Sequence, residues 1–161
     1  MQQPSSSYYI FAYGGNTNLN HLNKQYPGYS IISPKAILMN YRLVFQSYEC
    51  VNECCTFTKL EPCYCNIVPT QGSSVQGVLI QLSDAHLQKM DVQECVGCIY
   101  ERVKIQVSFL QNNSPSVECW TYRMIRPKEV ATPSERYLGV VKRGYEFHDI
   151  PLAQLGLHDT V

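Results

Sequence analysis

The sequence has no long hydrophobic run and no excess of charge of either sign. No stretch approaches the ~18 apolar residues that a membrane-spanning helix requires. The N-terminus reads Met-Gln-Gln-Pro-Ser-Ser-Ser, without the basic start and apolar centre of a signal peptide. Lys plus Arg number 13 and Asp plus Glu number 13, so the formal net charge is zero. Phosphate backbones and anionic lipids attract concentrated positive charge, and we therefore expect neither a nucleic acid nor a membrane as a partner.

The 161 residues also lack internal repeats and low-complexity segments, and their number fits one domain. Hydrophobic residues make up 45% of the chain, which is enough to bury a substantial core. We expect residues 1–7 to be a disordered tail and residues 8–161 to form a single domain. A chain without a targeting segment stays where it is made, which predicts a cytoplasmic location. The oligomeric state is left open, with a homodimer as one alternative.

Strong metal-site spacing is lacking too, although the chain has eight cysteines. The pairs Cys63-x-Cys65 and Cys95-x-x-Cys98 could share one zinc ion, but only the second has a common zinc spacing. Neither has the flanking turn residues of a zinc knuckle. Cysteines in a reducing compartment behave as small buried hydrophobic residues. We therefore predict reduced thiols, no metal and no cofactor.

Six segments have the β-branched, aromatic or alternating pattern of strands. They are residues 8–13, 36–46, 64–68, 75–82, 103–109 and 117–125. Residues 69–72 and 112–115 are predicted turns, the second of them inside a hairpin over 99–125. Residues 47–62 are polar and are interpreted as a loop. Because apolar residues occupy both faces of 75–82, this strand is expected at the centre of a sheet.

Three helices complete the pattern. The first follows a cap at Asn16 or Thr17, and the second follows Ser83. The third extends from a Thr-Pro-Ser-Glu capping sequence at 132–135, with Thr132 as the cap, to Gly144. There is too little helix between the strands for repeated crossovers. The sequence therefore predicts an α+β fold, in which a small mixed six-stranded sheet is curled into a barrel with about three flanking helices.

A glycine-rich turn, Tyr13-Gly14-Gly15-Asn16, lies between the first strand and the first helix. Two glycines permit positive φ and allow backbone N–H groups to approach a ligand closely. The N-terminus of the following helix favours negative charge, so the turn suits a carboxylate or an oxyanion. The alternative is structural, because many such turns only reverse the chain.

Three acids surround the end of the second helix: Asp91, Glu94 and Glu101. Glu94 lies after the short helix and before a strand, where a rigid scaffold presents a side chain to a cleft. Solvated loop carboxylates are far commoner than catalytic ones, and composition does not choose among the three.

These features occur within motifs that resemble the γ-glutamylcyclotransferases and the related AIG2-like proteins. Residues 11–16, Phe-Ala-Tyr-Gly-Gly-Asn, are similar to the Phe-Ala-Tyr-Gly-Ser-Asn signature of that family. The family's Val-x-Gly-Val, Leu-Asp-x-x-Glu, Tyr-x-Arg-x, Pro-Ser-x-x-Tyr and Gly-x(6)-Pro elements have similar sequences, in order, at residues 75–79, 90–94, 100–103, 133–137 and 144–151. Two departures are Gly15, where the family has serine, and Cys95, where a glycine is frequent.

The resemblance implies the family's fold and its reaction, a lyase-type intramolecular acyl transfer. A γ-glutamyl amide is cyclised to 5-oxoproline and a free amine is released, which belongs to glutathione metabolism. Glu94 corresponds to the family's catalytic glutamate and would act as general base and then acid. Such a role requires partial burial, which raises a glutamate pKa from its reference value of about 4.3. Residues 13–16 would hold the small-molecule γ-glutamyl substrate through backbone N–H groups.

Tyr137 resembles a pocket tyrosine of the family, and the alternative is a core residue of a helix with an incidental hydroxyl. The preferred substrate is also open. A γ-glutamylamine cyclotransferase that acts on ε-(γ-glutamyl)lysine and a glutathione-specific enzyme are the alternatives within the family. A non-catalytic binding module of the same fold is the alternative outside enzymes: Gly15 keeps it open, and Glu94 argues against it.

Overall fold

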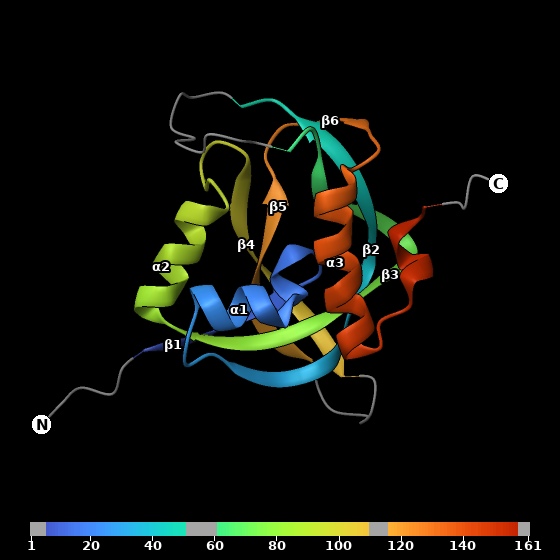
Figure 1. Ribbon diagram of the computed structural model, residues 1–161. Coiled ribbons are helices and arrows are strands. Elements are labelled where there is room, and N and C mark those ends of the chain that lie inside the picture. Colours follow the sequence, from blue (N-terminus) through green and yellow to red (C-terminus); the bar gives the residue numbers. More distant parts are fainter. Residues whose placement is uncertain (1–5, 51–60, 110–115, 158–161) are drawn as a thin grey trace, which may run out of the picture.

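The computed structural model describes residues 6–50, 61–109 and 116–157. In chain order its elements are β1 (Ser7–Ala12), the 3-10 turn η1 (Gly15–Thr17), α1 (Leu19–Gln25), β2 (Ser30–Tyr48), β3 (Tyr64–Ser83), α2 (Asp84–Gln93), β4 (Tyr100–Phe109), β5 (Val117–Met124), β6 (Pro127–Val130), α3 (Glu135–His148) and η2 (Leu152–Leu155). In Figure 1, α1 lies between α2 and α3 in front of the sheet.

The sheet closes on itself. Its strand order is β3-β1-β5-β4-β2-β6, and an additional pairing of β3 with β2 turns the first five strands into a barrel. The pairing of β1 with β5 is parallel, whereas the other pairings are antiparallel. Closure removes the exposed strand edges that an open sheet would present to other chains. The predicted α+β fold with a small mixed sheet curled into a barrel is confirmed.

The long strand β3 corrects one prediction. Residues 64–68 and 75–82 belong to a single strand, and the expected turn at 69–72 is a bulge within it. Tyr41 pairs with Pro69 and Met39 with Ser74, so the extra residues are on the β3 side. A bulge lets a long strand bend around a small barrel without ending. Residues 75–82 pair with both β1 and β2, which confirms their central position.

Other strand predictions are confirmed with changed ends. The hairpin over 99–125 is formed by β4 and β5, with Tyr100 opposite Met124 and Val107 opposite Val117. The short, exposed β6 was not predicted; it pairs with β2 outside the barrel. Ser7, which the sequence placed in the tail, is the first residue of β1 and pairs with Ser83 of β3. Residues 1–5, most of the predicted loop and the turn at 112–115 lie outside the described residues.

Two of the three helix caps differ from the predictions. Asn18, not Asn16 or Thr17, caps α1, because its side chain accepts from the His21 N–H while the two earlier residues form η1. Ser83 caps α2 as predicted. The cap of α3 is Ser134 and not Thr132: the Ser134 hydroxyl accepts the Tyr137 N–H at 3.1 Å.

The third helix does not end at Gly144 but continues to His148, where Asp149 adopts a left-handed conformation. Gly144 serves a close contact instead. A Cβ there would lie 2.1 Å from Thr17 Oγ1. Around this contact, the Tyr145 hydroxyl donates to the Tyr13 carbonyl at 2.6 Å, and His148 Nε2 lies 2.9 Å from the Thr17 carbonyl. The C-terminal part of helix α3 therefore packs against both ends of the segment that contains the glycine-rich turn.

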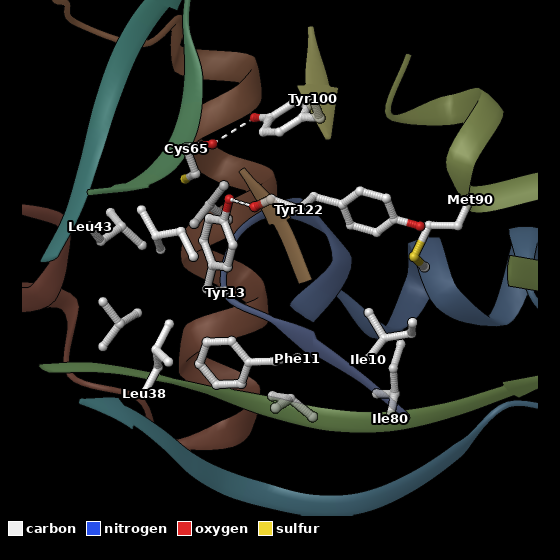
Figure 2. Close-up of a cluster of buried hydrophobic side chains, with 14 of the residues drawn as sticks. Ile10, Phe11, Tyr13, Leu38, Leu43, Cys65, Ile80, Met90, Tyr100 and Tyr122 are labelled. Carbon is white, nitrogen blue, oxygen red and sulfur yellow. Dashed lines mark hydrogen bonds between the residues drawn. The ribbon is translucent and has the colours of Figure 1, made fainter. Parts of the chain in front are cut away.

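Buried side chains from the barrel strands and from the inner faces of the helices form one core (Figure 2). Cys63, Cys65 and Cys119 are buried thiols within it, as expected. The expectation of reduced thiols is wrong for Cys98, which is disulfide-bonded. Sequence spacing does not reveal which cysteines the fold brings together.

The described residues contain no group of three or more His, Cys, Asp and Glu side chains arranged to hold a metal ion. Within the same residues, no helix combines the length and apolar character needed to cross a membrane.

Candidate active site

A cavity of about 260 Å³ lies where the end of β1 meets the 3-10 turn, α1 and the segment after α2. Strands β3, β4 and β5 and helix α3 complete its walls. The lining residues are Ala12, Tyr13, Gly14, Gly15, Asn16, His21, Tyr64, Cys65, Gln93, Glu94, Cys95, Ile99, Tyr100, Tyr122, Tyr137 and Val140.

The cavity brings together every site residue that the sequence indicated, from three separate parts of the chain. These are Tyr13, Gly14, Gly15, Asn16, Glu94 and Tyr137. Sequence reasoning missed the other polar residues of the wall, which are His21, Tyr64, Cys65, Gln93, Tyr100 and Tyr122. Tyr100 and Gln93 lie in family-like motifs and Cys65 lies in a Cys-x-Cys pair, but none of these patterns marked a site residue. His21, Tyr64 and Tyr122 have no distinctive sequence pattern.

Neither glycine of the turn has a positive φ, which corrects the expectation for both, and close packing restricts a side chain only at Gly14. Gly14 has φ −127°, and a Cβ there would lie 3.1 Å from Cys65 Cβ. A Cβ on Gly15 would meet the Tyr137 ring at an ordinary 3.8 Å. The Thr17 N–H donates to the Gly14 carbonyl, and the first N–H groups of such a turn have no partner inside it. The turn can therefore direct N–H groups into the cavity.

Glu94 immediately follows α2, and its N–H donates to the Met90 carbonyl at 2.8 Å. Burial raises the pKa of its carboxyl to about 7, and the nearby Asp91 charge adds to this effect. A hydrogen bond from Asn16 Nδ2 to Glu94 Oε1 at 2.8 Å acts in the opposite direction, since it stabilises the ionised form. A group with this pKa changes protonation state close to neutral pH.

The other two candidate acids are held in ion pairs. Asp91 accepts a hydrogen bond from the Tyr122 hydroxyl at 2.7 Å and lies 3.5 Å from Arg102 Nε. Glu101 pairs with Arg123 at 2.9 Å. Neither acid has the combination of burial and cavity access that Glu94 has. The structure thereby distinguishes the three acids that composition could not.

Tyrosine hydroxyls around the cavity are engaged in holding the barrel. Figure 2 shows the Tyr13 hydroxyl directed at the Tyr122 carbonyl, and the Tyr100 hydroxyl directed at the Cys65 carbonyl, at 2.5 Å and 2.6 Å. The Tyr137 hydroxyl accepts the Cys65 N–H at 3.1 Å. Burial raises the pKa of Tyr13, Tyr100 and Tyr137, so all three stay neutral. Substrate binding by the Tyr137 hydroxyl stays a prediction.

Cys95, the residue after Glu94, stands where a glycine is frequent in the resembled family. Cys95 has φ +47°, in the left-handed region that favours glycine. Its N–H donates to the Val92 carbonyl, and the Ile99 N–H donates to the Cys95 carbonyl. The tight turn that presents Glu94 therefore forms with cysteine in a position suited to glycine.

The cavity wall is polar but carries little charge. Among the described residues that line it, none is lysine or arginine. Burial and the Lys89 charge lower the pKa of His21, which keeps its ring neutral. No lysine or arginine among these described lining residues holds Glu94 ionised, and a carboxyl in such surroundings can both accept and return a proton near neutral pH.

Residues 10–139 match the family model described as Gamma-glutamyl cyclotransferase, AIG2-like. No curated protein matches the chain at a significant level. A solved structure of a gamma-glutamyl cyclotransferase is 23% identical with a TM-score of 0.77, over 92% of this chain and 83% of the other.

Two further solved structures are similar. An uncharacterized protein from Homo sapiens is 22% identical with a TM-score of 0.77, over 96% of this chain and 91% of that one. A yeast gamma-glutamyl cyclotransferase specific to glutathione is 14% identical with a TM-score of 0.53, over 97% and 91%. At these identities the likeness establishes a shared fold.

Proposed function

Because the chain belongs to the AIG2-like gamma-glutamyl cyclotransferase family, we propose that it cyclises a γ-glutamyl amide, releasing 5-oxoproline and a free amine. The proposed substrate is a γ-glutamyl amino acid or peptide. The observation that carries the proposal is Glu94, a carboxyl with a pKa of about 7 in a cavity whose described lining residues include no lysine or arginine.

Cyclisation requires a proton acceptor of this kind. The α-ammonium group of the substrate cannot attack until it loses a proton, and Glu94 takes that proton as general base. The free amine then attacks the γ-carbonyl, and a new C–N bond closes the five-membered ring. As the original amide C–N bond breaks, Glu94 returns the proton to the departing nitrogen. The second proton lost by the attacking nitrogen completes the released ammonium.

The same residue suits both halves of the step. A carboxyl with an ordinary pKa of about 4.3 would be a weak base toward an ammonium group and a poor proton donor at neutral pH. With a pKa of about 7, Glu94 exchanges protons in either direction at modest cost.

The turn 13–16 supplies the second requirement. Negative charge builds up on the γ-carbonyl oxygen as the amine attacks, and fixed backbone N–H groups stabilise it without rearranging. The N–H groups of Gly15 and Asn16 open the 3-10 turn at the cavity wall, where they could also hold the α-carboxylate. Binding of the substrate oxygens by neutral N–H donors is consistent with described lining residues that include no lysine or arginine.

The experiment that tests the proposal measures 5-oxoproline release from γ-glutamyl-alanine, ε-(γ-glutamyl)lysine and glutathione in separate incubations. Release from the first supports the proposed substrate class. Preferential release from the second or third would assign the protein to the γ-glutamylamine or glutathione-specific alternative. If none yields 5-oxoproline while the folded protein still binds it, the non-catalytic binding module is the better interpretation. The cytoplasmic location and the homodimer stay predictions.

A further inference from the structure

A chain of three polar side chains leads from the first turn of α1 to the Glu94 carboxylate. Asn16 Nδ2 donates to Glu94 Oε1 at 2.8 Å, and Asn16 Oδ1 lies 3.1 Å from His21 Nε2. All three side chains line the cavity. The cyclisation step described above uses Glu94 but gives no task to His21.

In the Asn16 side-chain amide, the nitrogen donates hydrogen bonds and the oxygen accepts them. These roles determine which atom carries the proton in each hydrogen bond between His21, Asn16 and Glu94. Asn16 Oδ1 can only accept, so His21 must donate from Nε2, which makes the neutral ring the Nε2–H tautomer. Without that donor the Asn16 amide is free to turn over and offer Oδ1 to Glu94. The reversed amide would favour a proton on Glu94 Oε1 over an ionised carboxylate.

His21 is itself well placed to act as a fixed donor. Its backbone N–H donates to Asn18 Oδ1, the cap of α1, at 3.1 Å. Its ring contacts the buried Tyr26 ring edge-on, with 5.9 Å between the centroids. Burial and the charge of Lys89 lower the His21 pKa, so the ring is neutral near pH 7 and would keep its Nε2 donor even when protonated.

We propose that His21 is a positioning residue that holds the Asn16 amide with its N–H toward Glu94 Oε1. Oε1 is thereby kept as an acceptor, and Oε2 becomes the oxygen that takes the substrate proton and returns it. The reaction in this inference rests on the proposed function, whereas the orientation of Asn16 rests on the hydrogen-bond chain itself.

Few charges compete with this arrangement. Asp91 on α2 faces Glu94, and Lys89 on the same helix faces His21. Cys95 lines the adjoining wall. The other titratable groups around Glu94 are phenols and a thiol whose pKa values are raised by burial, and they are Tyr13, Tyr26, Tyr64, Cys65, Tyr100, Tyr122 and Tyr137.

The test compares two substitutions of similar size at one position. His21→Leu fills the space and removes the donor, whereas His21→Gln replaces the imidazole N–H with an amide N–H. For each protein, NMR measures the Glu94 carboxyl titration, and a pH series of 5-oxoproline release gives kcat and KM. In the unsubstituted protein, NMR of the ring nitrogens reports the His21 tautomer directly, which needs no variant to fold.

The proposal predicts an Nε2–H ring and a His21→Leu enzyme whose Glu94 pKa rises by about 1. Its kcat should fall about ten-fold on the acid side of the profile and approach the wild-type value at high pH, with little change in KM. His21→Gln should restore most of this loss. An Nδ1–H ring in the unsubstituted protein would overturn the proposal, as would losses that are equal in both variants and independent of pH.

The carboxyl titration separates failure of this inference from failure of the proposed function. If the unsubstituted protein releases no 5-oxoproline, the function is wrong. The difference in Glu94 pKa between His21→Leu and His21→Gln still decides whether His21 orients Asn16.

Discussion

Alanine substitution at two glycines of α3 is expected to change stability in opposite directions. Replacing glycine by alanine inside a helix stabilises it by roughly 0.5–1 kcal/mol when there is space for the methyl group. At Gly139 there is space, since a Cβ would come no closer than 3.8 Å, to Arg143 Nη1. At Gly144 a Cβ would lie 2.1 Å from Thr17 Oγ1 and 2.9 Å from the Asn18 nitrogen. A methyl group at position 144 would therefore force α3 away from Thr17 and Asn18.

Overpacking of this kind costs about 1–3 kcal/mol or more, which exceeds the gain in helix propensity. Gly144→Ala should therefore lower the free energy of unfolding by about 1–2 kcal/mol, whereas Gly139→Ala should raise it by up to about 1 kcal/mol. For a domain of this size the Tm should fall by about 2–8 °C in the first variant and rise by about 1–4 °C in the second. Differential scanning calorimetry at one pH measures both. Equal stability of the two variants would refute the inference that α3 supports the turn through Gly144.

The remaining predictions concern the cavity. Folding raises the Glu94 pKa from 4.5 to about 7, so the folded state binds this proton more tightly than the unfolded state does. The wild type should therefore lose about 3 kcal/mol of unfolding free energy, relative to Glu94→Gln, as pH rises from about 4.5 to 7. Urea denaturation at a series of pH values measures this difference. A difference that does not depend on pH would contradict this. Tyr137→Phe leaves the buried Cys65 N–H without its acceptor and should cost about 1–3 kcal/mol in the same assay, whereas the exposed Tyr9→Phe should cost under about 0.5 kcal/mol. A Cβ at position 15 would make only an ordinary 3.8 Å contact with Tyr137, so Gly15→Ser should change the Tm by less than about 2 °C, and any change in KM then reports on the hydroxyl. A large fall in Tm would show that the turn has no space for the serine hydroxyl.

Local patterns predicted much of this fold. Alternation along 103–109, the Ser83 cap and the return strand at 117–125 all reappear, because each depends on neighbouring residues. The errors occurred where tertiary contacts decide. Gly144 has the features of a helix end, yet it lies within α3 because the helix packs against Thr17.

The site shows the same division. The resemblance to a family indicated Glu94 and residues 13–16, and the cavity contains them all. Nothing in the sequence near His21 indicates that its ring lies 3.1 Å from the Asn16 amide, since that contact depends on how α1 leaves the 3-10 turn. The ion pairs that set Asp91 and Glu101 apart from Glu94 likewise join different elements of the fold.

The account depends most directly on the Glu94 carboxyl as the group that exchanges protons with the substrate. Gln has nearly the same shape and can still accept the Asn16 hydrogen bond, but it cannot take up and return a proton at neutral pH. Glu94→Gln should therefore fold and bind 5-oxoproline, while its kcat for 5-oxoproline release falls by about 10²–10⁴-fold. The control Glu101→Gln loses only an ion pair with Arg123 and should be affected far less. Turnover by Glu94→Gln close to that of the wild type would contradict both the mechanism and the assignment of Glu94.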